Sequence, residues 1–181
     1  MKIEHKIGNA TQPTGEGKKL IFHVCNDEGK WGSGFVLGLN KAFGTNPGSP
    51  RYNYDLWYSE RDTIPAGATG PFKLGQVQYI KVKDDVTVVN CIAQSTPGGF
   101  ISKVTGKTFA PVRYQSLEEC LLRVRDAVEP AIKKGQSISL HSPLMGCGLA
   151  RGSWEVVEDI IKRVFDGLDV TWTVWTLPEG K

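Results

Sequence analysis

The sequence predicts an α/β fold in which helices cover both faces of a mixed, six-stranded sheet. Short runs of β-branched and aromatic residues alternate along the chain with longer amphipathic runs, which is typical of layered α/β domains. The 181 residues come to little more than one average domain, and 40% hydrophobic and 23% charged residues are ordinary for a globular protein. We therefore expect one domain spanning residues 1–181.

Six short windows account for the predicted strands. Each carries four or more strand-favouring or apolar residues. The predicted strands are residues 3–7, 20–25, 76–82, 87–93, 137–141 and 170–176.

The clearest helix is predicted over residues 116–134. Its apolar residues recur every three or four positions, as on a helix that packs one face against a sheet. Ser116 and Glu119 form a capping-box pattern at its start, and Gly135 after two lysines favours its end.

Three other segments are interpreted from their composition. Residues 153–165 carry a second apolar stripe, and residues 34–43 form a helix after a glycine turn. Residues 44–71 are rich in Gly, Pro and Asn, but an aromatic cluster within them favours a short helix framed by loops. Residues 97–111 are predicted to be a mobile excursion from the domain.

Composition and charge exclude several classes of protein. The 22 basic and 19 acidic residues leave a net charge of +3, too weak and too dispersed to indicate a nucleic-acid or membrane surface. The apolar runs are far shorter than the roughly 20 residues of a membrane span, and the first residues lack the apolar stretch of a signal peptide. We expect a cytoplasmic protein.

The four cysteines lack the paired spacing of a zinc site or a redox motif, so we expect reduced thiols and no bound metal. Cys25, Cys91 and Cys120 lie in apolar contexts and are interpreted as small buried hydrophobic residues. Cys147 is the exception, because it lies between two glycines.

Two glycine-rich turns each follow a predicted strand and precede a helix, at residues 26–35 and 143–150. Glycines let the backbone approach a ligand closely, and the first turn of a helix offers free N–H groups. Each turn alone is more often a packing turn. Because two such turns at the carboxyl ends of strands would line one crevice, together they predict a site for a diphosphate.

These residues and their spacing resemble the macrodomain family of ADP-ribose-binding modules. The resemblance covers almost the whole chain and points to the branch that includes ADP-ribose 1″-phosphate phosphatases and small de-ADP-ribosylating proteins. It implies a three-layer α/β/α sandwich. The matching segments are residues 7–11 (IGNAT), 23–26 (HVCN), 31–35 (WGSGF) and 143–149 (PLMGCGL), Trp154, and residues 173–177 (TVWTL).

The resemblance also implies which residues contact ADP-ribose. Family members usually carry Asp where this sequence has Asn9, whose carbonyl oxygen is expected to accept the hydrogen bond from the adenine amine. The implied ligand-binding residues are Asn9 and Ala10 at the adenine, Asn26, Gly32, Ser33, Gly34 and Phe35 at the proximal ribose and one phosphate, and Pro143, Met145, Gly146, Cys147, Gly148 and Leu149 at the diphosphate.

For activity, the resemblance implies hydrolysis of ADP-ribose 1″-phosphate to ADP-ribose and phosphate, with no cofactor. That reaction needs a nucleophile, a proton donor for the leaving oxygen and N–H dipoles for the phosphoryl group. His23 would transfer the proton and Asp27 would orient water, although a hydrogen-bonded core histidine is an equal interpretation of His23. Cys147 is a weaker candidate nucleophile, and His141 is a second histidine for which we favour burial.

The chain departs from the relatives that cleave glutamate or nucleobase linkages. Those proteins carry an acidic residue after Gly-Cys-Gly-Leu and a lysine near the end of the central strand, where this sequence has Ala150 and Gln94. Neither residue can act as an acid or a covalent amine.

Three alternative functions therefore stay open. The chain could be a non-catalytic reader or sequestering protein for ADP-ribose, or an ADP-ribosyl hydrolase that uses substrate-assisted water. A nucleic-acid site built on the aromatic cluster at residues 52–58 is a weaker interpretation, because such aromatics usually pack against the sheet. The expected partner is ADP-ribose or its 1″-phosphate, bound by a monomer.

Overall fold

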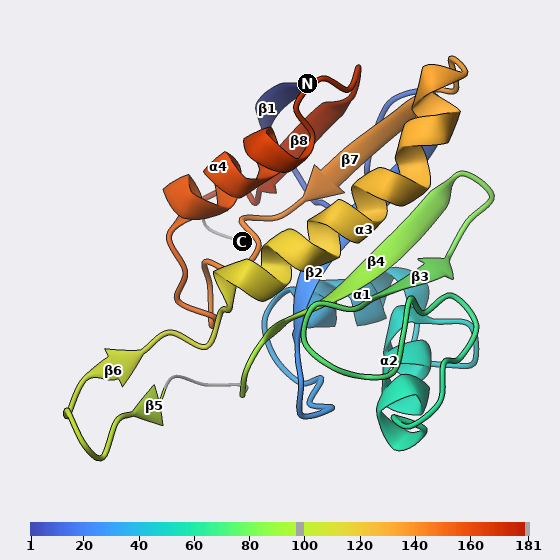
Figure 1. Ribbon diagram of the computed structural model, residues 1–181. Coiled ribbons are helices and arrows are strands. Elements are labelled where there is room, and N and C mark those ends of the chain that lie inside the picture. The colour runs from blue at the N-terminus through green and yellow to red at the C-terminus, as the bar shows by residue number, and fades with distance from the viewer. Residues whose placement is uncertain (97–99, 180–181) are drawn as a thin grey trace.

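The computed structural model describes residues 1–96 and 100–179, and its centre is a mixed six-stranded sheet (Figure 1). The strand order is β1-β8-β7-β2-β4-β3, with β3 antiparallel to β4 and all other neighbours parallel. All six predicted strands are present, with ends within two residues of the prediction. They are β1 (Lys2–Ile7), β2 (Lys18–Asn26), β3 (Val77–Lys81), β4 (Val86–Gln94), β7 (Ile138–Ser142) and β8 (Thr171–Thr176).

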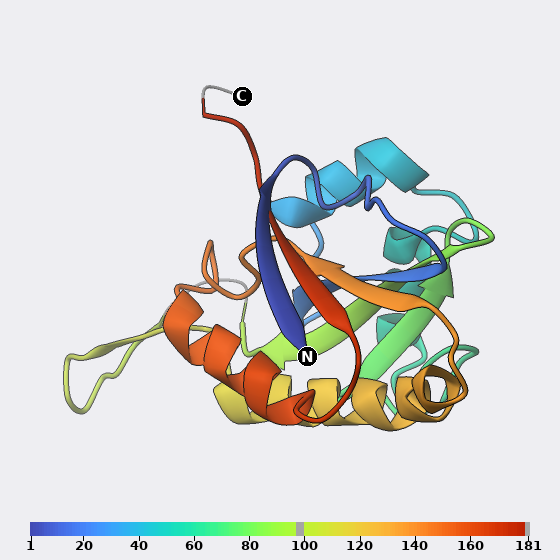
Figure 2. The same ribbon diagram turned by 90° about the horizontal axis from the view of Figure 1, so that it is seen from above.

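Helices cover both faces of this sheet, so the predicted three-layer α/β/α sandwich is confirmed (Figure 2). Helices α3 (Tyr114–Lys133) and α4 (Trp154–Val164) pack on one face. Helices α1 (Phe35–Phe43) and α2 (Pro50–Ser59) pack on the other. The central strands β2 and β4 are almost entirely buried, because parallel strands covered on both sides must be apolar in both directions.

The start of α3 differs from the prediction. The helix begins at Tyr114, two residues before the predicted start, and Arg113 is its N-cap without a side-chain cap hydrogen bond. The predicted Ser116 capping box is therefore wrong. Val112, just before the N-cap, forms a β-bridge with Gln94 at the end of β4. This tertiary contact fixes the chain beside β4, so the helix begins two residues earlier than the local pattern suggests. Gly135, with φ of +80°, does follow the end of the helix.

The short helix predicted within residues 44–71 is α2. Its side chains Tyr54 and Trp57 are fully buried in the core between α1, α2 and the sheet. Buried rings cannot stack on a nucleobase, so two of the four aromatic residues in this cluster are not available for nucleic-acid binding.

The segment predicted as a mobile excursion lies partly outside the described residues, which omit 97–99. The remainder forms a two-stranded hairpin of β5 (Phe100–Ile101) and β6 (Thr108–Phe109), which the sequence analysis did not predict. Figure 1 shows this hairpin projecting away from the sheet.

The interpretation of three cysteines as buried small residues is confirmed, because Cys25, Cys91 and Cys120 are free and buried while Cys147 is half-buried. Among the described helices, none has the length and apolarity needed to cross a bilayer.

The topology places the carboxyl ends of five parallel strands at one edge. These are β1, β8, β7, β2 and β4, in that order across the sheet. With neighbouring strands about 4.8 Å apart, their ends span about 19 Å. Loops that leave these ends form the candidate site, where open α/β sheets usually bind ligands.

Candidate functional site

A cleft of about 720 Å³ lies over the carboxyl ends of the parallel strands. Of the fifteen site residues predicted from the sequence, all but Asp27 line it. The cleft has two ends. The β1 end is lined by Asn9, Ala10, Val36, Trp175 and Leu177, and the β4 end by Gln94 and Ala150.

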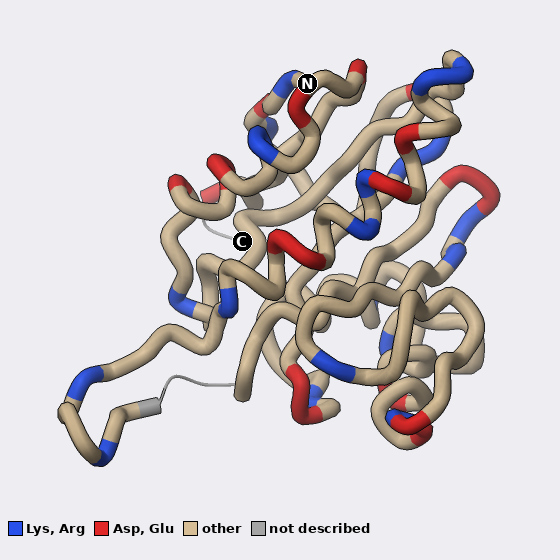
Figure 3. Tube along the Cα trace, in the orientation of Figure 1, with Lys and Arg blue, Asp and Glu red and all other residues tan. Residues whose placement is uncertain are grey.

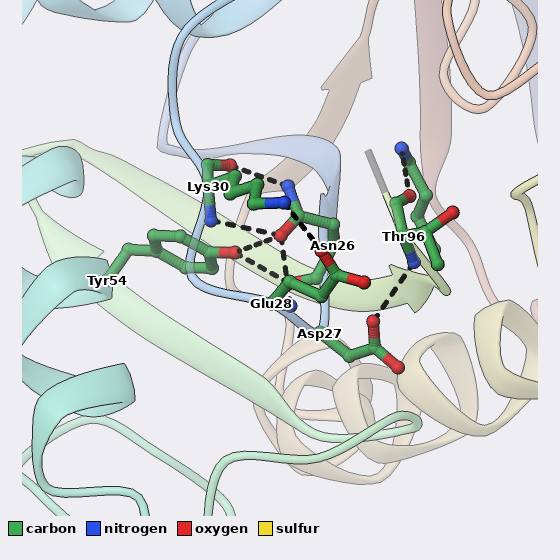
Figure 4. Close-up of polar contacts among 7 residues, drawn as sticks. Asn26, Asp27, Glu28, Lys30, Tyr54 and Thr96 are labelled. Atoms are coloured by element: carbon green, nitrogen blue, oxygen red, sulfur yellow. Dashed lines mark hydrogen bonds and ion pairs between the residues drawn. The ribbon is translucent and has the colours of Figure 1, made fainter. Parts of the chain in front are cut away.

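Asn26 shapes the first glycine turn from within (Figure 4). Its Oδ1 accepts hydrogen bonds from the N–H groups of Glu28 and Lys30, both at 3.0 Å, and from the Tyr54 hydroxyl at 3.1 Å. Its Nδ2 donates to the Lys30 carbonyl at 2.5 Å. These bonds use the oxygen and one of the two Nδ2 donors within the protein, so Asn26 lines the cleft and also positions the turn.

The first turn ends at Gly34, the N-cap of α1. Gly34 has φ of +80° and ψ of −145°, a conformation open essentially to glycine alone. A Cβ built there would lie 3.5 Å from Leu149 Cδ1, so the two glycine turns approach each other directly. The N–H groups of Phe35 and Val36, in the first helical turn, have no intrahelical acceptor and carry the positive end of the helix dipole.

The second glycine turn is closed by its own backbone. The Gly152 N–H donates to the Gly146 carbonyl at 2.7 Å, and Gly146 has φ of +75°. No acceptor within residues 1–96 and 100–179 bonds the N–H groups of Gly148, Leu149 and Ala150. Together with the start of α1, these donors make the middle of the cleft suited to an anion.

The side chains around the cleft add no negative charge. Among the described residues that line it there is no Asp or Glu, and the one Lys or Arg is Lys30. The Lys30 ammonium pairs with Glu28 at 2.8 Å, which raises the pKa of Lys30. Elsewhere, acidic and basic residues are interspersed along the chain, as the composition indicated (Figure 3).

His23 lies in the floor of the cleft and is only 2% exposed. Its Nε2 is 2.5 Å from Asn90 Oδ1, and Asn90 Nδ2 donates to Gln78 Oε1 at 3.2 Å and to the Pro50 carbonyl at 3.3 Å. Because the amide oxygen of Asn90 must accept, His23 Nε2 carries the proton. Burial lowers the pKa of His23 to about 4 despite this bond, so the imidazole is neutral near pH 7 and cannot donate through Nδ1.

His141 lies outside the cleft and is 1% exposed, as the sequence analysis favoured. Its Nδ1 accepts a hydrogen bond from Trp175 Nε1 at 3.2 Å, and its Nε2 lies 2.8 Å from the Ser139 hydroxyl. Burial, followed by the charges of Lys19 and Lys6, lowers its pKa to about 4. His141 therefore holds the indole of Trp175, which forms a wall of the cleft.

Asp27 does not join the other predicted residues. Its Oδ1 accepts from the Thr96 N–H at 3.1 Å, and its own N–H donates to the Gln94 carbonyl at 2.9 Å (Figure 4). Asp27 does not line the cleft, so its placement gives no support to the expectation that it orients water there. A residue that follows a strand end by one position points to the opposite side from its predecessor, and here the predecessor Asn26 faces the cleft.

Two residues singled out by comparison with catalytic relatives do line the β4 end. Gln94 Nε2 donates to the Thr96 carbonyl at 2.8 Å, and the Ala150 carbonyl accepts from the Val112 N–H at 3.2 Å. Cys147 also lines the cleft, but burial raises the pKa of its thiol. A protonated thiol is a weak nucleophile, which counts against covalent catalysis by Cys147.

Asn9 differs from the expectation in the direction its amide faces. Its Oδ1 accepts from the Thr11 N–H at 3.0 Å and from the Thr11 hydroxyl at 2.9 Å. The carbonyl oxygen, expected to accept from adenine, is thus already bonded within the loop. Among the described residues no acceptor bonds its Nδ2.

Three apolar residues that line the β1 end were not among the predicted site residues. Trp175 lies at the end of β8, Leu177 lies just after it, and Val36 comes from the first turn of α1. Residues 173–177 had been noted for their family pattern, but no contact role followed from it. The available signal was positional, because the last residues of a parallel strand lie beside the loops that follow its neighbours.

Comparison with known proteins identifies relatives along the whole chain, although no protein-family model matches it. A protein of unknown function from Bacteroides thetaiotaomicron has a similar structure, with a TM-score of 0.79 and 35% identity over 97% of this chain and 98% of that one. A macrodomain protein from Streptomyces coelicolor has a TM-score of 0.73 and 32% identity over 97% of this chain and 99% of that one.

A curated relative matches a shorter stretch. The ADP-ribose glycohydrolase OARD1 of Bos taurus is 38% identical over 64 residues, which are 35% of this chain and 40% of that protein. The full-length likeness to the Streptomyces protein joins the shared fold to sequence identity across nearly all of both chains. On that evidence, this chain belongs to the macrodomain family.

Proposed function

We propose that this protein binds ADP-ribose along the cleft and hydrolyses a bond at the distal ribose, which makes it an ADP-ribosyl hydrolase. The observation that carries the proposal is the cradle of free backbone N–H groups in the middle of the cleft, at Gly148, Leu149, Ala150 and the start of α1. Such donors bind phosphate oxygens without a side chain. Membership of the macrodomain family and the name of the curated relative, an ADP-ribose glycohydrolase, support the same ligand.

The side chains of the cleft favour a particular leaving group. No carboxylic acid lines the cleft among the described residues, and His23 is neutral with its proton bonded to Asn90. The titratable donors that remain among the described lining residues are the Lys30 ammonium and the thiols of Cys25 and Cys147, whose pKa values are all raised, so a leaving group that must be protonated would have only weak acids beside it. A carboxylate with an ordinary pKa near 4.3 leaves without a proton. The linkage that fits best is an ester between ADP-ribose and a glutamate or aspartate side chain.

Water remains as the nucleophile in this proposal. Among the described lining residues there is no carboxylate, and the low pKa of about 4 makes His23 a weak base, so the attacking water is oriented by backbone groups and by the diphosphate of the substrate itself, which is the substrate-assisted route. Positioning and N–H dipoles can supply much of a rate enhancement without a side-chain base.

Phosphate release from ADP-ribose 1″-phosphate is the second candidate. The anion cradle suits its phosphates, but cleavage of the phosphorus–oxygen bond leaves a ribose oxygen that needs a proton donor. The two residues assigned to that chemistry are unfavourably placed, since His23 is neutral and buried and Asp27 lies outside the cleft. The geometry therefore gives the phosphatase less support than the ester hydrolase.

One set of assays separates these candidates. Purified protein in excess is incubated with an ADP-ribosylated glutamate peptide and, in parallel, with ADP-ribose 1″-phosphate. We expect release of ADP-ribose from the peptide. Phosphate release alone would favour the phosphatase, and tight ADP-ribose binding by calorimetry with neither product would make the protein a reader.

A further inference from the structure

The β1 end of the cleft is the part that suits a nucleobase, and this step rests on the proposed function. A diphosphate in the N–H cradle leaves one end of the cleft for the base and the other for the distal ribose. The β1 end has apolar walls from Ala10, Val36, Trp175 and Leu177. A flat, apolar base ring packs against such walls, whereas the β4 end carries the polar Gln94.

The walls of this end are fixed in place. Trp175 is held by its hydrogen bond to His141, and a Cβ at Gly8 would lie 2.8 Å from the Trp175 ring, so the ring packs on the glycine backbone. A Cβ at Gly38 would lie 3.7 Å from Thr11 Cγ2, which shows that α1 packs against the loop that carries Asn9. The polar side chain at this end is therefore presented from a packed loop.

The orientation of the Asn9 amide is decided by Thr11. The backbone N–H of Thr11 can only donate, so the atom 3.0 Å from it must be the amide oxygen. The Thr11 hydroxyl, 2.9 Å away, bonds the same oxygen. Asn9 lines the cleft, and with its oxygen held by Thr11 the group left to a ligand is its NH₂, whose two donors have no acceptor among the described residues.

Whether a purine can pair with this NH₂ group depends on the substituent at its C6. Adenine carries an amino group there, which is a donor, whereas hypoxanthine and guanine carry an oxygen, which is an acceptor. The NH₂ of Asn9 cannot pair with the amino group of adenine, because both are donors, whereas it can donate a hydrogen bond to an oxygen at C6. We propose that Asn9 is a specificity-determining residue that selects a purine with an oxygen at C6, so that the cleft binds inosine diphosphate ribose more tightly than ADP-ribose.

Titration calorimetry with these two ligands tests the proposal, because they differ only in the base at C6 and N1. We expect wild-type protein to bind inosine diphosphate ribose about three- to tenfold more tightly, the range of one partly exposed hydrogen bond. The Asn9→Asp variant keeps an oxygen for Thr11 and turns a second oxygen outward. It should reverse the preference in favour of ADP-ribose.

The Asn9→Ala variant is the matched control, and its two affinities should be nearly equal. Melting temperatures of the variants separate a loss of loop structure from a change in selectivity, since only the latter alters the affinity ratio. Tighter binding of ADP-ribose than of inosine diphosphate ribose by the wild type would overturn the inference and leave the proposed function standing. Binding of neither ligand would overturn the proposed function and the inference with it.

Discussion

His23 shows how a single side chain can lie at a ligand site and still act as part of the core. Its ring is buried edge-on to Trp31, with centroids 5.3 Å apart, and its proton is bonded to Asn90. Sequence context alone left a catalytic and a core interpretation equal, because both place a histidine on a strand before a loop. The partner that favours the core interpretation, Asn90, comes from β4, 67 positions along the chain, and no local pattern connects the two.

The low pKa of His23 predicts an acid-sensitive stability. The folded pKa of about 4 lies below the ordinary value of 6.5, so the unfolded chain binds the proton more readily. The contribution of neutral His23 is present above pH 6.5 and is lost as the pH falls from 6.5 to 4. His23→Gln keeps a donor where Nε2 lies but does not titrate. Urea denaturation should show the stability of wild type relative to this variant falling by about 2 kcal/mol between pH 7 and 4.5.

An unchanged difference between the two proteins over that pH range would show that His23 is not held neutral by the fold. His141→Gln provides a comparison, because burial also lowers the pKa of His141 to about 4 at a position outside the cleft.

Asn26 gives a second prediction at this scale. In Asn26→Asp, an oxygen replaces Nδ2 and faces the Lys30 carbonyl, while the three bonds to the other oxygen can remain. Two acceptors 2.5 Å apart repel each other, so we expect a loss of about 2 kcal/mol in unfolding free energy and weaker ADP-ribose binding. Chemical denaturation and calorimetry measure the two effects, and wild-type stability would show that the turn does not depend on this amide.

At the scale of elements, the site consists of two glycine turns that follow β2 and β7. Free backbone N–H groups form the middle of the cleft, so side chains introduced into the turns should matter more than side chains removed. Gly34 has little freedom to change, because its φ of +80° and ψ of −145° would strain other residues. Gly148 is different, since its φ is not in the left-handed region and a Cβ there would meet nothing within 4 Å.

Gly148→Glu therefore tests the anion cradle with the backbone left undisturbed. A carboxylate beside the diphosphate should weaken ADP-ribose binding by about 2 kcal/mol, or roughly thirtyfold, at low salt. Gly148→Gln has the same size without the charge and should bind more tightly than the Glu variant. Equal affinities of the two variants, measured by calorimetry, would place the diphosphate elsewhere.

The sequence predicted elements well where their signal is local. Six strands appear within two residues of their expected ends, since buried parallel strands need runs of apolar residues. It failed where a tertiary contact decides the outcome. The bridge between Val112 and Gln94 precedes α3, and the bond from Thr96 takes Asp27 away from the cleft. Most of the predicted residues line the cleft because two turns after parallel strands must share one edge, whereas the direction of Asp27 depends on a loop far along the chain. Their contacts with a ligand stay a prediction.

At the scale of the molecule, the sheet separates two hydrophobic cores. The cleft extends over strands that differ in how far they are buried from solvent. Strands β2 and β4 lie inside the sheet and are almost fully buried, whereas β1 is an edge strand paired with β8 alone and largely exposed. The loop that carries Asn9 follows this edge strand directly. A ligand that spans the cleft would thus connect the least protected strand to the most protected ones.

Hydrogen exchange should reveal this arrangement. In the free protein, amides of β1 should exchange faster than those of β2 and β4, because an edge strand opens without disrupting the core. Saturating ADP-ribose should slow exchange in β1 more than in the central strands. Equal rates in all three strands of the free protein, or no ligand effect on β1, would contradict this prediction.

The parallel pairing of β1 with β8 also affects how the protein can be handled. Leu177, just after β8, lines the cleft, while Met1 lies at the opposite end of the strand pair, about 20 Å away along β1 (Figure 2). A purification tag or fluorescent fusion attached shortly after Leu177 would begin beside the mouth of the cleft. One joined to the N-terminus would leave the mouth of the cleft open, and is the better choice for affinity measurements.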